Sequence, residues 1–410
     1  MEIKPIYLVM VTSDNHNKYY KMIPNGYSFN VEYGRVGASE QKRSYPISQW
    51  DKKYNEKIKK GYVDHTDLVQ DLIHEQKDNT NKSYKEIENS AIADIVNRLQ
   101  TLAKESVSKN YKVDSNQVTQ AMVDAAQDKI NKLSCFTSRT TINSFNDGLI
   151  ELFSIIPRKM RNVNDYLAKT KNDFSSIIKN EQDTLDVMRG QVIQNHVFDD
   201  NDIPTDNKEE NNNKTILEAM GLVFEPITTK EEKHIKELLG DSACYYKNAW
   251  KVTNLATQKR FDEFTKNEHI TEFKELWHGS KNENWWSIIN TGLVLRPTCG
   301  VVNGSMFGRG LYYAPKAKKS IGYTSVNGAY WTSGHSSTGF LAIMEVAYGT
   351  PYNVYSHDSS FYNFDYNKLK SVDPNANCLH AHAGAMLKND EIIIYKEEQC
   401  TIKYLVEIKN

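Results

Sequence analysis

The chain has 410 residues, with 51 Lys and Arg against 52 Asp and Glu, and a net charge of −1 at pH 7. At roughly 100–200 residues per domain, this length predicts two to four domains. The balanced charge excludes a uniformly basic nucleic-acid binder, although it is compatible with a local basic face. No apolar run approaches the ~20 residues of a membrane helix, and Met1–Pro5 lacks the apolar start of a signal peptide. We therefore expect no membrane partner. The five scattered cysteines include no Cys-x-x-Cys pair, so we expect no disulfide framework and no metal site.

Residues 1–75 are predicted to form a small, mostly-β domain. Asn25-Gly26 is a hairpin turn signal, and a helix is expected over Ile47–Lys60, ending at Gly61. The following residues, 71–90, are polar without an apolar period and are predicted to be a linker. Three runs have the composition of β-strands: Ile6–Thr12, Lys18–Ile23 and Ser28–Tyr33.

Residues 88–198 are predicted to form an all-α bundle, because their apolar residues recur with a helical period. Helices of this number and length pack with each apolar stripe turned inward. These stripes predict core residues and no cofactor site. The four stripes run over Ile92–Leu102, Val118–Leu133, Ile142–Ile156 and Phe174–Val192.

The third predicted domain, residues 215–410, follows an acidic, Asn-rich connector over 198–214. A helix is expected around Lys230–Leu239 and a strand over Trp250–Leu255. The remainder is strand and loop with repeated glycine and aromatic residues, which predicts an α+β domain.

The residues that suggest chemistry lie in Leu276–Tyr323 and at Asp390–Tyr395. A histidine followed by a glycine leaves bare backbone beside a polar side chain, which suits a ligand that approaches the main chain closely. Each residue alone has a structural explanation, as a satisfied histidine, a core tyrosine or a solvated acid at a strand end. Their combination favours a ligand pocket: His278-Gly279, the turn Gly308–Gly310 before Tyr312-Tyr313, Ser320, Tyr323, and Glu391 before a β-branched strand.

The order and spacing of these segments resemble the catalytic domain of poly(ADP-ribose) polymerases. The family's His-Tyr-Glu triad falls on His278, Tyr312 and Glu391, and Ile402–Leu405 matches the family's last strand. The resemblance implies an ADP-ribosyltransferase domain with antiparallel sheets, which takes NAD+ as a substrate and holds no permanent cofactor. It also implies a set of NAD+-binding residues: His278, Gly279, Ser280, Asn284, Arg296, Tyr312, Tyr313, Ser320 and Tyr323.

The resemblance assigns a role to several of these residues. The backbone of Gly279 and the hydroxyl of Ser320 are expected to hold the nicotinamide carboxamide. Tyr323 is expected to stack on the nicotinamide ring, with Tyr312 as the opposite wall. His278 would hold a hydroxyl of the adenosine ribose. Glu391 would accept a hydrogen bond from the nicotinamide ribose 2′-OH and stabilise the positive charge that develops as nicotinamide leaves.

Two positions depart from the family pattern. Where the family usually has an arginine after a Gly-Leu pair, this chain has Val294 after Gly292-Leu293. Arg296, two residues further on the same strand face, is expected to take its place in the adenosine subsite. The segment Asp373–Asn389 is shorter than the family's acceptor loop, so the choice of acceptor stays open.

The N-terminal domain carries a second resemblance. Tyr33-Gly34-Arg35-Val36-Gly37, followed by a Lys-rich helix and Gly61-Tyr62, is similar to a WGR domain, with Tyr33 in place of the family's tryptophan. In these polymerases that module grips DNA ends, which implies that Tyr33 and Arg35 bind DNA or relay its signal. The alternative is a small β-domain that binds only its neighbouring domains. The Leu152–Pro157 segment similarly resembles the end of a helix in the family's helical regulatory domain.

Together these features predict an NAD+ ADP-ribosyltransferase of the poly(ADP-ribose) polymerase type, stimulated by DNA strand breaks and modifying itself and other proteins. The alternatives are a mono-ADP-ribosyltransferase or NAD glycohydrolase, and a catalytically silent scaffold that binds NAD+ or DNA. We expect it in the nucleus of a eukaryote, or in the cytoplasm or nucleoid of a bacterium.

Overall fold

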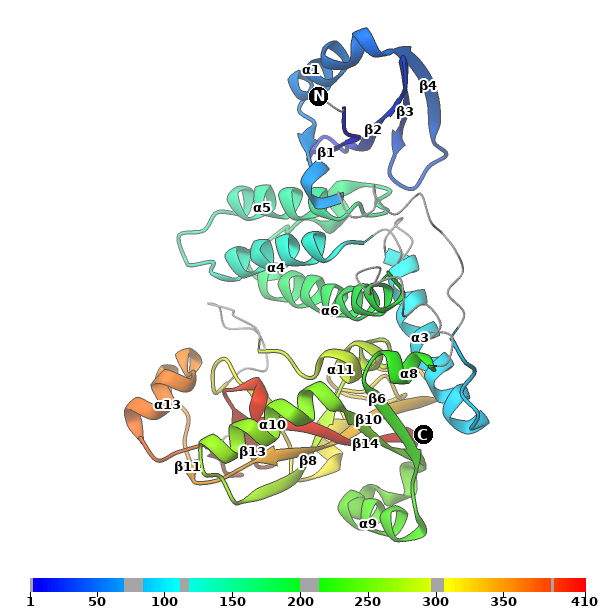
Figure 1. The fold of residues 1–410 in the computed structure, drawn as a ribbon. Helices are drawn as coiled ribbons and strands as arrows, with labels where there is room; N and C mark the ends of the chain where they lie inside the picture. Colours follow the sequence, from blue (N-terminus) through cyan, green and yellow to red (C-terminus); the bar gives the residue numbers. More distant parts are fainter. Residues whose placement is uncertain (1–2, 70–83, 111–117, 200–213, 296–305, 385–386) are drawn as a thin grey trace. The chain divides into compact units, whose positions relative to one another are not determined.

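A computed structural model describes residues 3–69, 84–110, 118–199, 214–295, 306–384 and 387–410 (Figure 1). The chain forms two compact units. The N-terminal unit comprises residues 1–81 and 104–195. The other unit comprises residues 82–103 and 196–410, and we call it the catalytic unit because it contains the segments that resemble a catalytic domain. The division falls within one helix, α3 (Ser90–Asn110). No helix within the described ranges is long and apolar enough to cross a membrane.

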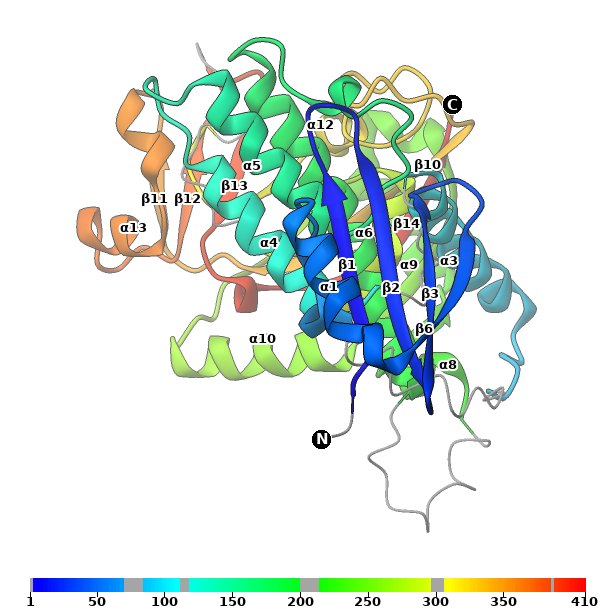
Figure 2. The same cartoon turned by 90° about the horizontal axis from the view of Figure 1, so that it is seen from above.

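The N-terminal unit begins with a five-stranded antiparallel sheet in the order β4-β3-β2-β1-β5. Figure 2 shows its strands β1, β2 and β3 side by side. Helix α1 (Trp50–Lys59) confirms the predicted helix, and its Trp50 packs edge-on against Phe29 in the core of the sheet. Gly26, with a φ of 61°, makes the predicted hairpin turn. The remaining elements are β1 (Ile6–Val11), β2 (Asn17–Asn25), β3 (Ser28–Arg35), β4 (Gln41–Pro46), η1 (Ile47–Gln49), β5 (Val63–Asp64) and η2 (Thr66–Val69).

The N-terminal unit continues with helices after its sheet. The hydroxyls of Thr119 and Thr141 cap the first turns of α4 and α5, each accepting a hydrogen bond from a backbone N–H of its helix. Phe145 and Phe174 stack with ring centroids 3.8 Å apart, which joins α5 to α6. The all-α prediction for this region is confirmed: α4 (Gln120–Ser134), α5 (Ile142–Ile155), η4 (Val163–Tyr166) and α6 (Asp173–Asp199).

The catalytic unit contains two sheets. The larger has the antiparallel order β6-β7-β14-β10-β8. The smaller has the order β11-β12-β13-β9 and is antiparallel apart from the parallel pair β11 and β12. The strands are β6 (Leu222–Pro226), β7 (Tyr246–Asn254), β8 (Phe273–Gly279), β9 (Leu311–Tyr313), β10 (Thr338–Ala347), β11 (Pro351–Val354), β12 (Cys378–Ala381), β13 (Glu391–Ile394) and β14 (Cys400–Lys409).

Short helices connect these strands and position their ends. The predicted α+β class of this region is therefore confirmed. The helices are α8 (Ile216–Ala219), α9 (Thr229–Leu239), η6 (Gly240–Tyr245), α10 (Leu255–Asn267), η7 (Asn282–Asn284), α11 (Trp285–Thr291), α12 (Ala317–Ile321), η8 (Ser359–Asn363), α13 (Tyr366–Val372) and η9 (Glu397–Gln399).

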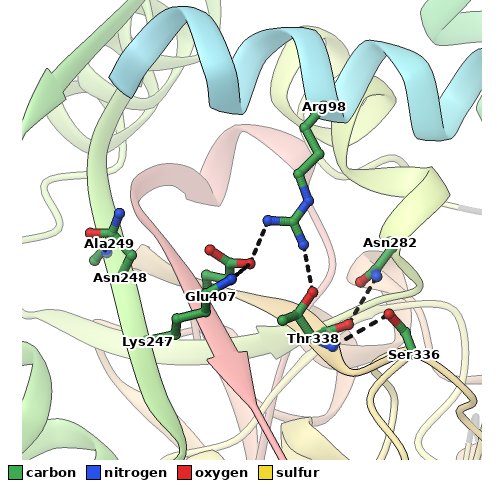
Figure 3. A network of polar contacts seen from close by, with 8 residues as sticks. All are labelled: Arg98, Lys247, Asn248, Ala249, Asn282, Ser336, Thr338 and Glu407. Carbon is green, nitrogen blue, oxygen red and sulfur yellow. Dashed lines mark hydrogen bonds and ion pairs between the residues drawn. The ribbon is translucent and has the colours of Figure 1, made fainter. Parts of the chain in front are cut away.

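The N-terminal part of α3 is fastened to the larger sheet by Arg98 (Figure 3). The Arg98 guanidinium forms an ion pair with Glu407 on β14, donates a hydrogen bond to the Thr338 hydroxyl, and lies 5.0 Å from the ring centroid of Phe340 on β10. Lys247 also pairs with Glu407, at 3.1 Å. Because Glu407 is only 3% exposed, its charge depends on these two cations. Part of the predicted bundle thus packs with the catalytic unit, while the predicted boundaries at 75, 88, 198 and 215 stay predictions.

Candidate active site

The candidate site forms where the two sheets of the catalytic unit touch. Trp277 on β8 and Ala314, just after β9, exchange backbone hydrogen bonds of 2.9 and 3.0 Å. On the smaller sheet, Tyr312 of β9 pairs with Ile393 of β13, so Glu391 at the start of β13 lies near the end of β9. The topology therefore brings His278, Tyr312 and Glu391 together from three strands.

A hydrogen bond and two neighbouring aromatic rings position the His278 imidazole. Its Nδ1 lies 3.2 Å from the carbonyl oxygen of Tyr312, so this nitrogen carries the proton and donates it. The rings of Trp285 and Tyr313 lie 6.4 and 6.0 Å from the imidazole ring. Tyr313 is only 2% exposed. It therefore packs behind the histidine, and its predicted contact with NAD+ stays a prediction.

Gly279 is required by a close backbone approach. A Cβ at this position would lie 2.0 Å from the carbonyl oxygen of Ser320, so no other residue fits without moving α12. The Ser320 hydroxyl is buried and donates a 3.1 Å hydrogen bond to the carbonyl of Trp277. Nearby, the Asn284 side-chain amide donates to the Ser280 hydroxyl at 2.9 Å. The predicted residues of this part of the pocket are thus brought together and linked to one another.

Tyr312 fixes the glycine-rich turn before it. Its hydroxyl donates to the carbonyl of Gly308 and accepts from the backbone N–H of Phe307, both at 2.9 Å. Gly308 has a φ of 76°, and a Cβ there would lie 2.2 Å from the carbonyl oxygen of Phe364. Burial, with a smaller contribution from the charge of Glu391, raises the pKa of Tyr312 far above its ordinary value. Tyr312 therefore remains a neutral wall and an anchor at any physiological pH.

Glu391 lies opposite an unpredicted cation. Lys319 on α12 forms an ion pair with its carboxylate, and both side chains are largely buried. Lys319 directly precedes Ser320, which was predicted to bind NAD+. Lys319 itself was not predicted from the sequence, because its residue type and spacing alone indicate no role. Burial and the charge of Glu391 raise the pKa of Tyr323 to about 12, which places this ring within the field of the same carboxylate.

Tyr323 has a second neighbour that the sequence did not indicate. The ring of Trp331 stacks on it with a centroid separation of 5.9 Å and an interplanar angle of 20°. The backbone N–H of Trp331 donates to the carbonyl of Gly322 at 2.8 Å, which holds the loop in place. Arg296, predicted for the adenosine subsite, lies outside the described residues.

The N-terminal sheet carries the two residues predicted for DNA. The Lys57 ammonium lies 4.2, 5.5 and 6.0 Å from the ring centroids of Tyr20, Tyr62 and Tyr33, an arrangement typical of cation–π contacts. Burial lowers the pKa of Lys57. Tyr33 therefore belongs to an aromatic cluster around a lysine on α1.

Arg35 contacts the helical part of the same unit. Its guanidinium donates to the carbonyls of Met160 and Arg161 at 3.1 and 2.9 Å, and to the backbone and side-chain oxygens of Asn15 at 2.8 Å. Asn17 donates to the carbonyl of Arg158 at 2.9 Å. These bonds place Arg35 at the junction between the sheet and the segment that follows α5.

Known proteins share both parts of the chain. Residues 230–410 match the poly(ADP-ribose) polymerase catalytic domain, and residues 5–68 match the WGR domain. An uncharacterized protein, 101L, of Invertebrate iridescent virus 6 is 34% identical over 189 residues, covering 46% of this chain and 77% of that protein. The putative poly [ADP-ribose] polymerase-like protein 100L of the same virus is 30% identical over 164 residues, covering 38% of this chain and 82% of that protein. Poly [ADP-ribose] polymerase 2 of Arabidopsis thaliana is 30% identical over 155 residues, covering 33% of this chain and 23% of that protein.

The paired sheets and the catalytic-domain match define an NAD+ ADP-ribosyltransferase. The chain belongs to the poly(ADP-ribose) polymerase family. Its WGR domain indicates that it binds nucleic acid.

Proposed function

We propose that this enzyme is a poly(ADP-ribose) polymerase that DNA strand breaks stimulate, and that it modifies itself and other proteins. The regulatory part of this proposal rests on a series of connected hydrogen bonds and ion pairs within the N-terminal unit. Arg35 and Asn17 bond the backbone of residues 158–161, and the Arg158 side chain forms a buried ion pair with Glu181 on α6. A change at the sheet would reach the helices through these contacts.

The proposed chemistry is cleavage of the bond between the ribose C1′ of NAD+ and the nicotinamide nitrogen. The bonding electrons leave with nicotinamide, positive charge develops on the ribose, and an acceptor nucleophile then bonds to C1′. The Gly279 backbone and Ser320 would orient the carboxamide, and Tyr323 would stack on the departing ring. Catalysis requires stronger interaction with the transition state than with bound NAD+.

Glu391 is the group that meets this requirement. Its carboxylate would accept a hydrogen bond from the ribose 2′-OH and would stabilise the oxocarbenium-like state electrostatically. Lys319 compensates the carboxylate charge in the absence of NAD+. Binding of NAD+ would replace part of this compensation, because its nicotinamide ring would bring a positive charge close to Glu391.

Regulation would run through the helices. Helix α3 is continuous across the division between the two compact units, and Arg98 holds its N-terminal part on the catalytic sheet. A switch of this kind needs a bias of only a few kcal/mol between two states. DNA binding by the WGR domain would supply that bias by changing the contacts of Arg35.

The test is NAD+ turnover by the full chain, with and without nicked or blunt DNA, with labelled products resolved by length. We expect DNA to raise turnover and the products to be chains attached to the enzyme itself. Raising salt should weaken this response, because phosphate contacts release counterions. Single ADP-ribose units on protein would indicate a mono-transferase, and free ADP-ribose alone a glycohydrolase. Full turnover without DNA would refute the sensor function.

A further inference from the structure

A cluster of two histidines and an aspartate lies beside Glu391. His380 is on β12, His382 directly follows that strand, and Asp390 directly precedes β13. One potential ligand atom from each of the three residues lies within 4.8 Å of the others. Residues two apart on a strand share a face, and the pairing of Ala381 with Glu391 brings Asp390 to the same end of the sheet.

In this cluster, Nε2 of His380, Nδ1 of His382 and Oδ2 of Asp390 face one another, and we call them the inner atoms. Oδ2 of Asp390 lies 3.0 Å from Nε2 of His380 and 3.8 Å from Nδ1 of His382. The two imidazole rings stack with centroids 4.0 Å apart, which holds both nitrogens on the same side. The ring of Tyr355 stacks on His382, with centroids 4.5 Å apart and an interplanar angle of 8°. Two nitrogens and one oxygen from the three side chains thus lie close enough together to bind one ion.

The outer atoms of the cluster are already fixed by other groups. Nδ1 of His380 lies 2.8 Å from the Tyr348 hydroxyl, and Nε2 of His382 lies 2.7 Å from Oδ1 of Asn353. Oδ1 of Asp390 accepts a hydrogen bond from the backbone N–H of Ala383 at 2.8 Å. Metal-binding histidines characteristically have their second nitrogen held in this way, which sets the tautomer and the ring orientation.

The tautomer of His382 is the decisive feature. The side-chain oxygen of Asn353 can only accept a hydrogen bond, so Nε2 of His382 carries the proton. In the neutral ring, Nδ1 then has an unprotonated lone pair. This lone pair faces the Asp390 carboxylate at 3.8 Å. Two acceptors that face each other repel, unless a proton or a cation lies between them. A cation at this point would satisfy both, and His380 would bind it through Nε2 as the neutral tautomer that carries its proton on Nδ1 and donates it to the Tyr348 hydroxyl.

We infer that His380, His382 and Asp390 form a divalent metal site whose donor set favours Zn²⁺. Two imidazoles and one carboxylate suit zinc, whereas Mg²⁺ and Ca²⁺ prefer oxygen ligands throughout. Three protein ligands leave a fourth position for water or a ligand group. The ion would tie the end of β12 to the residue before Glu391. This inference requires only the β12–β13 pair and does not rest on the proposed function.

The test is metal binding by the full chain after removal of bound metal with a chelator. We expect about one equivalent of Zn²⁺ per chain by calorimetry, a rise in the melting temperature on zinc addition, and visible absorption bands when Co²⁺ replaces Zn²⁺. His382→Gln and Asp390→Asn should each abolish this equivalent and the rise in melting temperature. Tyr348→Phe, which removes only an outer hydrogen bond, should weaken binding roughly tenfold to a hundredfold.

His335→Gln is the matched control, because this exposed histidine lies outside the cluster. It should bind zinc as the wild-type chain does. Circular dichroism of each metal-free variant shows whether a loss of binding reflects unfolding. The inference is overturned if folded His382→Gln and Asp390→Asn variants bind zinc as tightly as the wild type. It is also overturned if the wild type shows no saturable binding, in which case the cluster is a hydrogen-bonded structural element.

Discussion

The ammonium group of Lys319 on α12 forms an ion pair with the carboxylate of Glu391 at the start of β13. The side chains are only 17% and 10% exposed, so neither charge is compensated by bulk water alone. The pair links the segment of Ser320 and Tyr323, which we expect to bind nicotinamide, to the acid that we propose stabilises the transition state.

Glu391→Gln should preserve the fold while removing most ADP-ribosyl transfer. The amide retains the shape of the side chain but loses the charge that favours an oxocarbenium-like state. By analogy with other electrostatic catalytic groups, we expect turnover to fall about a hundredfold to a thousandfold. Nicotinamide release and product length measure this, with NAD+ affinity by calorimetry as the control. Undiminished polymer formation would show that another acid performs this role.

Lys319→Met should destabilise the catalytic unit by roughly 3 kcal/mol, because it leaves a largely buried carboxylate without its cation. The double variant Lys319→Met/Glu391→Gln should recover most of this loss, since no unpaired charge remains. The measurement is a double-mutant cycle by chemical denaturation. A coupling energy near zero would mean that water or another group compensates Glu391.

Alkaline pH should reduce stability through the tyrosines of the catalytic unit. Burial raises the pKa of Tyr323, Tyr246 and Tyr348 from 10.0 to about 12 in the folded chain. The folded state thus holds these protons more tightly than the unfolded state. This tighter proton binding stabilises the folded state fully below pH 10, and the stabilisation is lost as the pH rises through about 12. The free energy of unfolding should fall across this window, and less steeply in Tyr323→Phe. Equal slopes for the two proteins would contradict the assignment to Tyr323.

Arg98→Met should lower the stability of the catalytic unit by about 2 kcal/mol, the range for a hydrogen bond to a charged group. Glu407 would keep only Lys247 as a partner, and Thr338 would lose its donor. Arg98→Lys is the matched control, because it retains the charge but not the two-pronged geometry. Calorimetry that separates the transitions of the two units measures the change. An unchanged catalytic transition would mean that the helix is not anchored there.

Arg35→Ala should reduce the stimulation of turnover by DNA more than it reduces DNA affinity. Its guanidinium donates hydrogen bonds to protein oxygens of Asn15, Met160 and Arg161. DNA affinity by fluorescence anisotropy and turnover with and without DNA separate the two effects. Arg139→Ala, an exposed arginine elsewhere in the same unit, removes the same charge and should leave stimulation intact. Equal loss in both variants would indicate a general charge effect.

Short sequence patterns predicted the turns and helix ends well, because neighbouring residues determine these features. Asn25-Gly26 specified a hairpin through the backbone freedom of glycine, and Pro157 ended the helix that finishes at Ile155. The membership of the polymerase family also followed from short motifs that keep their order along the chain. The individual roles of His278, Gly279, Ser320 and Tyr323 remain predictions, now with defined neighbours.

Other features depend on residues that are distant in sequence. Nothing in the run around Lys319 indicates that it faces Glu391, since 72 residues separate them. The attachment of Arg98 to Glu407 spans 309 residues, and it places part of a predicted bundle with the catalytic sheet.

The class of fold and the family could be predicted from the sequence alone, which also indicated candidate residues for NAD+ binding. These depend on periodicity, turn chemistry and motif order, all of which are written along the chain. The three-dimensional fold was needed to show which charges compensate one another, and that the side chains of His380, His382 and Asp390 lie close together. Strand pairing determines such neighbours, and the register of that pairing is set by the packing of the whole unit.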